Sequence, residues 1–320
     1  MATMIVSLLA ALLMVAGTLI PADCLASEKK IAVMWVGESE MPTNLIRGFL
    51  PRLKELAPDM QVTVKTALPD FQTAGRLFHE FESQMDGIVF LRSDGAEFLG
   101  KAKPKIPCFV GDTNNPRELG VVLNLERPEG NITGVTYYLP YSKRLAAIRT
   151  IFPNIKSVGL LLEKDHPGTP IDQEGTSTEC EKLRIQYEEF VAANREDLAR
   201  GAKELASKVQ VLIASSTPLC EDNTPLLVEI SHTTKVPLFA YSDAAVGNGA
   251  LAGLAARNDV LGRMLADSVV DVVVKGKPVA QVPVKTDPDP KLTLNEKEME
   301  FLSIRLPPSV LREAQIVRKR

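Results

Sequence analysis

The sequence predicts an α/β protein made of two Rossmann-like lobes joined by a three-segment hinge. Short apolar runs rich in β-branched residues alternate with helical patterns along the chain, which favours parallel sheets covered by helices. Most of the 320 residues follow the apolar N-terminal segment, and that is more than one hydrophobic core usually serves. The alternation forms two series, one before and one after about Pro140, so we expect two lobes.

The first series begins with the apolar run KIAVMWV at Lys30–Val36. Each of its strands is followed by a turn-forming stretch with Gly, Pro, Asp or Asn. The expected strands are Lys30–Val36, Gln61–Thr66, Gly87–Leu91 and Pro107–Gly111, with helices at Asn44–Ala57 and Phe71–Gln84.

The second series repeats this pattern after Pro140. Its expected strands are Ser157–Leu162, Tyr187–Ala192, Val209–Ala214 and Pro237–Ala240. Its expected helices are Tyr141–Phe152, Thr178–Ile185, Arg195–Lys208 and Thr224–Thr234.

The region after the second series supplies the hinge. Apolar residues at steps of three and four predict a helix at Leu261–Lys275, and Gly276 fits a left-handed cap. The Pro-Asp alternation of Thr286–Lys291 excludes helix and indicates a crossing strand or hinge.

We therefore expect crossings near residues 140, 253 and 282. This gives an N-terminal lobe of residues 28–139 plus 254–282 and a C-terminal lobe of residues 140–253 plus 283–320.

Residues 1–27 are interpreted as a secretory signal peptide. Met4–Ile20 carries no charged residue, Pro21 ends the run, and small residues precede the charged Glu28. An uncleaved membrane anchor is the main alternative, because the run is close to the length that spans a bilayer. Acylation of Cys24, as in a lipoprotein, is a second alternative. On all three readings the folded part is exported, and we expect a periplasmic protein.

Composition describes an ordinary soluble globular protein, with 45% hydrophobic residues, 24% charged residues and a net charge of −3. No run of Lys and Arg indicates nucleic-acid binding. Cleavage would leave Cys108, Cys180 and Cys220, an odd number, so at least one thiol is unpaired. We expect a buried thiol at Cys108, while a disulfide between Cys180 and Cys220 stays open.

Catalytic and metal-binding patterns do not occur in this sequence. His79, His166 and His232 have no Cys or carboxylate partners at metal-ligand spacing, and we interpret them as surface residues. There is no nucleophile elbow and no phosphate-binding loop. We therefore expect no enzyme activity, no cofactor and no metal.

Polar residues follow four of the predicted strands where each strand ends. In a parallel sheet these ends border the ligand crevice, and the following helices offer free N–H groups. Helix caps and turns favour the same residue types, but four such positions from both series favour a ligand cleft. The candidate residues are Ser93, Asp94, Asp112, Thr113, Ser215, Thr217, Ser242 and Asp243.

Trp35, the only tryptophan, stands at the end of the first predicted strand. Its indole could stack on a ligand or fill the core or the lobe interface. We include it among the candidate ligand contacts.

Three segments resemble the bacterial ABC-transporter substrate-binding family typified by tryptophan and tyrosine uptake proteins. They are GDTNNPRELGVVLNLERPEGNITGVTYYLP at Gly111–Pro140, the LFA, GALA, LGR and KGKP elements within Lys235–Pro278, and LTLNEKEMEFLSIRLPPSVLREAQIV at Leu292–Val317. The resemblance covers essentially the whole chain after residue 27.

This resemblance implies a type I periplasmic-binding fold and a small polar or amino-acid-like ligand between the lobes. It also implies an ABC permease in the inner membrane as partner, and we expect a monomer. It places the same polar residues near the ligand and adds Thr136. An exported ligand sensor for a signalling partner is the alternative, because it would share the fold and differ in its docking surface.

The sequence departs from the family pattern in two places. Residues 257–260 (Arg-Asn-Asp-Val) precede the LGR element where the family usually has an aromatic residue or an Asp-Tyr pair. The loop after Val209–Ala214 reads SSTPLCEDNTP instead of a short turn. Both differences count against specificity for aromatic amino acids.

Overall fold

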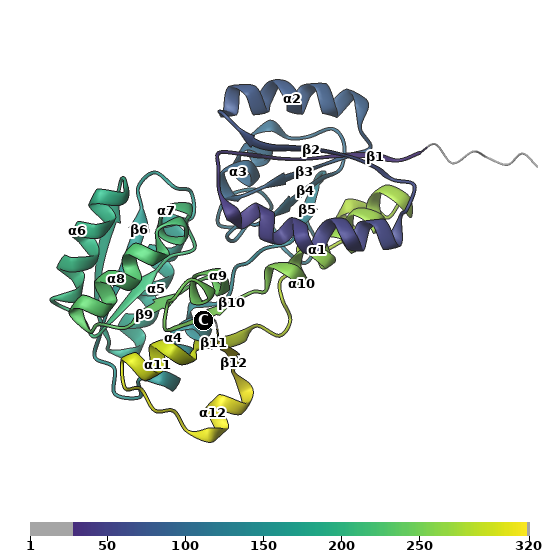
Figure 1. Cartoon of the computed structure of the whole chain (residues 1–320). Coiled ribbons are helices and arrows are strands. Elements are labelled where there is room, and N and C mark those ends of the chain that lie inside the picture. The colour runs from purple at the N-terminus through teal and green to yellow at the C-terminus, as the bar shows by residue number, and fades with distance from the viewer. Residues whose placement is uncertain (1–27, 319–320) are drawn as a thin grey trace, which may run out of the picture.

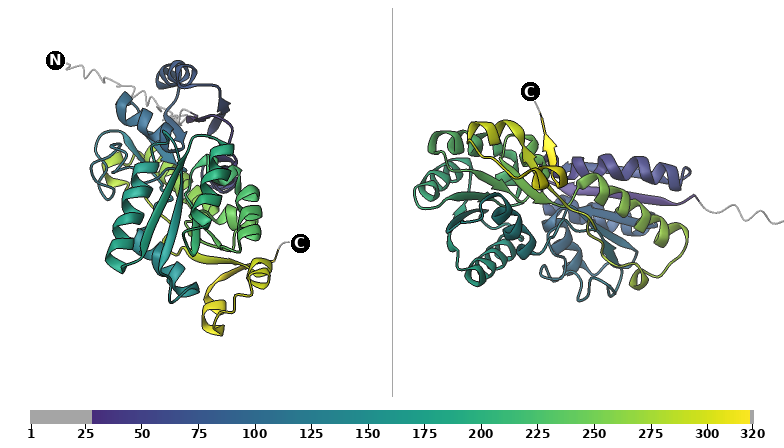
Figure 2. Two further views of the ribbon diagram at one scale, coloured as in Figure 1. Left: turned by 90° about the vertical axis from the view of Figure 1, so that its left-hand side faces the viewer. Right: turned by 90° about the horizontal axis from the view of Figure 1, so that it is seen from below.

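The computed structural model describes residues 28–318, so the predicted signal peptide and Cys24 lie outside the described residues. The chain forms two α/β lobes, each a β-sheet with helices packed on its faces (Figure 1). Two further views show the same separation into lobes, with the C-terminal segment at the second lobe (Figure 2). The predicted two-lobe α/β architecture is therefore confirmed.

The N-terminal lobe is built on a parallel sheet with the strand order β2-β1-β3-β4-β5. Strand β3 is buried along its whole length, as expected for a parallel strand covered on both faces. The strands are β1 (Lys30–Val36), β2 (Gln61–Leu68), β3 (Gly87–Leu91), β4 (Cys108–Gly111) and β5 (Ile132–Gly134).

Alternating residues of β1 pack into two apolar layers, one on each face of the sheet, because successive side chains of a strand point to opposite faces. Ile31 and Val33 pack in the layer of α1 and α10. Ala32 and Met34 pack in the layer of α2 and α3. The helices are α1 (Glu40–Leu56), α2 (Phe71–Gln84), α3 (Ser93–Ala102) and α10 (Asn258–Val269).

Helix α10 follows the second βα series in the sequence but packs on α1 of the N-terminal lobe. The two helices approach closely at two glycines. A Cβ atom would lie 2.3 Å from the Asp259 carbonyl oxygen at Gly48, and 2.2 Å from the Leu45 carbonyl oxygen at Gly262. Helix α10 continues into a π-helical turn, and Gly276 follows with φ +68°, the left-handed conformation expected there.

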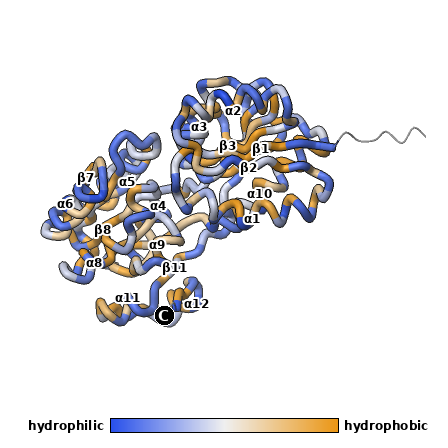
Figure 3. The backbone as a smooth tube through the Cα atoms, turned by 45° about the horizontal axis from the view of Figure 1, so that its top comes forward, coloured by the Kyte–Doolittle hydropathy of each residue, from blue (hydrophilic) through white to orange (hydrophobic). Residues whose placement is uncertain are grey.

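The C-terminal lobe is built on a sheet with the order β12-β11-β10-β9-β8-β6-β7, parallel except between β10 and β11. Its apolar residues gather in the strands, while the outer helix α6 is mainly polar (Figure 3). The strands are β6 (Ser157–Glu163), β7 (Gln186–Ala192), β8 (Val211–Ala214), β9 (Leu238–Ala240), β10 (Ala252–Ala255), β11 (Lys291–Asn295) and β12 (Gln315–Val317).

Helices α4 and α5 cover one face of this sheet, and α6 and α8 cover the other. Helix α5 begins nine residues before the predicted Thr178, at Thr169. Its buried face consists of Thr169, Asp172, Thr176 and Cys180, so hydrophobic periodicity does not reveal it. The helices are α4 (Tyr141–Ile151), α5 (Thr169–Leu183), α6 (Arg195–Ala206), α7 (Pro218–Asp222), α8 (Thr224–Thr234), α9 (Asp243–Gly247), α11 (Glu296–Phe301) and α12 (Pro308–Glu313).

The disulfide between Cys180 and Cys220, which the sequence left open, does not form. Both are free and buried, as is Cys108, for which a buried thiol was expected. Cys180 packs in the layer of α4 and α5, whereas Cys220 packs in the layer of α6 and α8. The sheet separates the two sulfur atoms.

The chain passes between the sheets three times, because β5 and α4, β10 and α10, and α10 and β11 belong to different lobes. We propose lobe boundaries near residues 140, 256 and 286. The last lies a few residues beyond the expected 282, because Val284 and Lys285 still donate backbone hydrogen bonds to Leu125 and Gly134 of the N-terminal lobe.

Candidate functional site

A narrow cavity lies between the lobes. It forms where the carboxyl ends of strands from both sheets meet, the usual position of a ligand site in open α/β sheets. Its polar side chains are Asp112 and Tyr137 from the N-terminal lobe and Ser216, Glu221, Ser242 and Asp243 from the C-terminal lobe, together with Asn258.

Asp112 is the most unusual residue of this cavity. Its side chain is buried, and neither carboxylate oxygen has a hydrogen-bond partner among residues 28–318. Its backbone has φ +51°, in the left-handed region, where strain of this kind tends to gather at functional sites. Burial raises the pKa of Asp112 well above its usual range, Glu221 raises it further, and Arg92 opposes the shift. The adjacent Thr113 hydroxyl is also buried without a partner in the described part of the chain.

Arg92 follows β3 as Asp112 follows β4, and it also has a left-handed φ, +76°. Its Nη1 donates to the Val36 carbonyl oxygen at 2.6 Å, and its Nη2 lies 3.3 Å from Asp94. Asp94 also accepts from the Gly95 N–H at 2.8 Å. These contacts hold the start of α3 and leave Arg92 only partly available to other anions.

Ser93 and Thr136 shape the loop after β4. The Ser93 hydroxyl accepts from the Asn114 N–H at 3.0 Å and lies 3.5 Å from the Tyr137 hydroxyl. The Thr136 hydroxyl donates to the carbonyl oxygens of Thr113 and Asn114 at 2.9 and 3.0 Å. Both hydroxyls are therefore engaged within the lobe.

The C-terminal lobe contributes two turns. After β8, the hydroxyls of Ser215 and Thr217 lie 3.2 Å apart and both are buried, while the residue between them, Ser216, lines the cavity. After β9, the Ser242 hydroxyl caps α9 by accepting from the Ala245 N–H at 3.4 Å, and Asp243 occupies the first turn of that helix.

Glu221 of α7 is partly buried at the edge of the same cavity. Burial raises the pKa of Glu221 to about 8, Ser242 opposes the shift, and Asp243 and Asp222 add to it. The cavity therefore places carboxyl groups from both lobes in a poorly solvated space.

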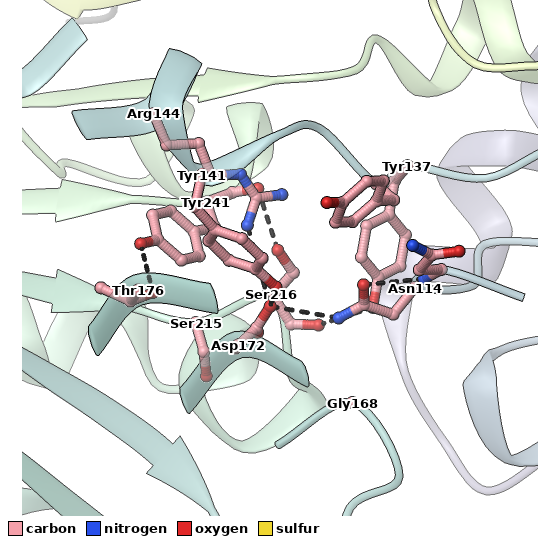
Figure 4. Close-up of polar contacts among 12 residues, drawn as sticks. Asn114, Tyr137, Tyr141, Arg144, Gly168, Asp172, Thr176, Ser215, Ser216 and Tyr241 are labelled. Atoms are coloured by element: carbon pink, nitrogen blue, oxygen red, sulfur yellow. Dashed lines mark hydrogen bonds and ion pairs between the residues drawn. The ribbon is translucent and has the colours of Figure 1, made fainter. Parts of the chain in front are cut away.

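A second polar cluster lies in the C-terminal lobe beside the cavity (Figure 4). Arg144 of α4 and Asp172 of α5 are both 1% exposed, and Nη1 of Arg144 is 3.8 Å from Oδ1 of Asp172. The guanidinium carbon stands 4.0 Å from the ring centroid of Tyr241, and the Tyr141 hydroxyl donates to Asp172 at 2.7 Å. Burial raises the pKa of Asp172, and Arg144 opposes the shift.

Two hydrogen bonds connect this cluster and its neighbours to the N-terminal lobe. Asn114 Nδ2 donates to Oδ1 of Asp172 at 3.1 Å, and the Tyr137 hydroxyl donates to the Ser216 carbonyl oxygen at 3.3 Å (Figure 4). The lobes therefore touch through polar groups at the cavity.

Trp35 is 4% exposed and packs in the apolar layer of the N-terminal lobe. It also lines a surface groove with Glu38, Ser39 and Thr43. The structure thus places the indole in the core of one lobe, and direct stacking on a ligand stays a prediction.

Metal and membrane features can be judged for residues 28–318 alone. In this part of the chain no group of three His, Cys, Asp or Glu side chains could hold a metal ion. No helix in the same range is long and apolar enough to cross a membrane. His166 is buried rather than on the surface, because it packs behind Gly168 and accepts its N–H at 3.1 Å.

Sequence reasoning selected Asp112, Ser242 and Asp243, which line the cavity, but it missed Arg144 and Glu221. A signal for Arg144 was available, since it lies three residues after Tyr141 and four before Ile148 on the apolar face of its helix. A charged residue on such a face needs a buried partner, which here is Asp172.

The profile of the family described as "ABC transporter substrate binding protein" matches residues 12–318. The chain belongs to this family. The family consists of extracytoplasmic substrate-binding proteins, which bind small ligands and interact with permeases, and not of enzymes.

Three relatives of this substrate-binding protein show how far the likeness extends. A tyrosine-binding protein of Clostridioides difficile (strain R20291) is 22% identical over 282 residues, 87% of this chain and 81% of the relative. An ABC domain from Streptococcus pneumonia, solved with L-Trp, has a TM-score of 0.82 at 23% identity and covers 91% of this chain and 100% of its own. A conserved domain protein from Vibrio cholerae O1 biovar El Tor gives 0.82 at 24% identity with the same coverage. The type I periplasmic-binding fold is confirmed.

Proposed function

We propose that this protein is the exported solute-binding component of an ABC importer. It closes its two lobes over an amino-acid-like ligand in the periplasm and presents that ligand, as a monomer, to a permease in the inner membrane. Two relatives support an amino-acid ligand by their descriptions, a tyrosine-binding protein and an L-Trp complex.

The observation that carries this proposal is the unpartnered carboxylate of Asp112 in the interlobe cavity. A buried carboxylate without hydrogen bonds is costly, and a ligand ammonium group would supply both the charge and the donors it lacks. The free hydroxyl of Thr113 offers a donor to the ligand's carboxylate. We propose Ser93, Ser216 and Ser242 as further groups around the bound molecule.

The test begins with a thermal-shift screen of the standard amino acids, followed by calorimetry on the compounds that bind. Asp112→Asn keeps the size of the side chain and its tolerance of a left-handed backbone while removing the charge. Losing a hydrogen bond to a charged group should weaken binding by about 10- to 150-fold, from a cost of roughly 1.5–3 kcal/mol.

Asp59→Asn is the matched control, because Asp59 is exposed in the turn before β2. Binding to the Asp112→Asn variant with the affinity of the unmodified protein would remove Asp112 from the site. Recovery of a chemically altered ligand would show catalysis and contradict the proposal.

A further inference from the structure

A groove opens between the lobes next to the cavity of Asp112. On the N-terminal lobe it is lined by Glu38, Ser39, Glu40 and Asn44, at the start of α1. On the other lobe Glu221 and Asp222 line it, and Glu221 also lines the cavity. The groove therefore leads to the cavity, and we call its four carboxylates, Glu38, Glu40, Glu221 and Asp222, the acidic mouth.

The acidic mouth gathers four carboxyl groups without a matching cation. No Lys or Arg is among its lining residues, and none of the four carboxylates forms an ion pair within residues 28–318. Burial raises the pKa of Asp222, the like charge of Glu40 raises it further, and the positive charge of Arg92 opposes the shift. Arg92 is itself bound by the Val36 carbonyl and Asp94.

The cavity behind the mouth adds an independent observation. Asp112, 2% exposed, directs a carboxylate without partners into a space that it shares with Glu221 and Asp243. No three of these side chains converge closely enough to hold a metal ion in the described part of the chain. The negative charge is spread along a path from groove to cavity, which suits an extended organic cation better than a single ion.

Closing the lobes brings carboxylates of one lobe toward those of the other. Repulsion between carboxylates in a poorly solvated space opposes closure. A cation between them attracts both carboxylates, and its presence therefore favours closure. A negative mouth also attracts cations from solution and raises their association rate.

We propose that the cleft selects a net-cationic small molecule, such as a basic amino acid, with one ammonium group at Asp112 and a second cationic group in the acidic mouth. This inference rests on the proposed function, because it names the class of ligand for the same cleft. A neutral amino acid has no second cationic group, so it would leave the carboxylates of the acidic mouth without a cation.

The experiment is calorimetry with L-arginine, L-lysine and the diamine putrescine, compared with L-tyrosine, L-tryptophan and L-leucine. We expect the cationic compounds to bind more tightly, with an affinity that falls as salt rises. The double variant Glu38→Gln, Glu40→Gln should weaken binding of the preferred cation by about 3- to 10-fold. Both side chains are exposed at the start of α1, so the fold should be retained.

Glu129→Gln is the control, since Glu129 is an exposed carboxylate outside the acidic mouth. Tight binding of L-tyrosine, L-tryptophan or L-leucine without binding of any cationic compound would overturn the inference and leave the proposed function standing. Equal affinity of the double variant and the unmodified protein for the cation would overturn the role of the mouth. Failure of all three cationic compounds to bind would overturn the inference, while the proposed function is decided by the screen of the standard amino acids.

Discussion

At the scale of single residues, the cleft differs from an ordinary protein interior in having buried polar groups without partners. Asp112 lines the cavity in this condition, the adjacent Thr113 hydroxyl is also without a partner, and Arg144 has two unpartnered nitrogen atoms in the described residues. Interiors normally satisfy such groups because each unsatisfied one costs about 1–3 kcal/mol. Their presence near two left-handed residues, Arg92 and Asp112, indicates a site whose partner is a ligand.

Glu221 leads to a prediction about pH. Its pKa is raised to about 8 where the lobes surround it, so closure of the empty lobes favours the protonated acid. Between the ordinary pKa of a glutamate and about 8, closure takes up a proton and becomes less favourable as pH rises. Asp112 and Asp243, whose pKa values burial also raises, act in the same direction, while Ser242 and Arg92 oppose these shifts.

Small-angle scattering of the ligand-free protein should therefore show a smaller radius of gyration at pH 6 than at pH 9. Glu221→Gln should reduce this difference, because the amide needs no proton to enter the closed site. A protein more open at pH 6 than at pH 9 would contradict the assignment. Burial lowers the pKa of His166 to about 4, so burying His166 on closure acts in the opposite direction near pH 6, and the Glu221→Gln variant separates the contribution of Glu221 from that of His166.

The polar residues of the site could be predicted only in part from sequence. Ser, Thr and Asp after parallel strands correctly indicated Asp112 and Ser242 as cavity residues, because strand ends converge at one edge of a sheet. The same rule could not distinguish Ser216, which lines the cavity, from Ser215 and Thr217, whose hydroxyls face each other. That distinction depends on the direction of side chains in one tight turn.

At the scale of elements, the long strands and helices could be predicted from the spacing of apolar residues in the sequence. Strand β1 and helix α2 have the predicted bounds, because β1 is a continuous apolar run and α2 has an amphipathic face. The short strands β5 and β10 and the segment β11–β12 were missed, since three to five residues carry little periodicity. The formation of these short strands depends on backbone hydrogen bonds to neighbouring strands of the sheet, and local sequence does not reveal those neighbours.

The crossing of α1 and α10 supports a prediction about stability. Gly262→Ala would place a Cβ atom 2.2 Å from the Leu45 carbonyl oxygen, so the helices must move apart. We expect a loss of about 1–3 kcal/mol, seen as a lower midpoint in thermal or denaturant unfolding.

Gly75→Ala is the control within a helix of the same lobe, because its Cβ atom would be 3.8 Å from the nearest side-chain atom, Phe98. That change should stabilise the protein by about 0.5–1 kcal/mol through helix propensity. An equal effect of both substitutions would contradict the argument from close helix packing.

At the scale of the whole molecule, the two lobes meet through few polar contacts, as expected of a protein that opens and closes. Asn114 reaches Asp172 across the cleft, while Asp172 keeps Tyr141 and Arg144 within its own lobe. Asn114→Ala should therefore disfavour closure, although it also removes the hydrogen bond that the Asn115 N–H donates to Oδ1 of Asn114 within the N-terminal lobe.

The expected result is a loss of ligand affinity of about 10- to 150-fold by calorimetry, with a small drop in the unfolding midpoint in the absence of ligand from the lost Asn115 hydrogen bond. Tyr137→Phe removes the other interlobe hydrogen bond, between neutral groups, and should cost about 2- to 10-fold. Full affinity in both variants would show that these contacts do not hold the closed form.

The late position of α10 also affects how the chain acquires its fold. A growing polypeptide that has reached residue 139 already contains β1–β5, yet Leu45 and Phe49 of α1 lack the apolar partners that residues 258–269 provide. Such a precursor exposes a hydrophobic helix face of the kind that holding chaperones bind. Stable folding therefore waits until most of the chain has been made, which would favour the export that we propose, because the unfolded chain stays available for translocation.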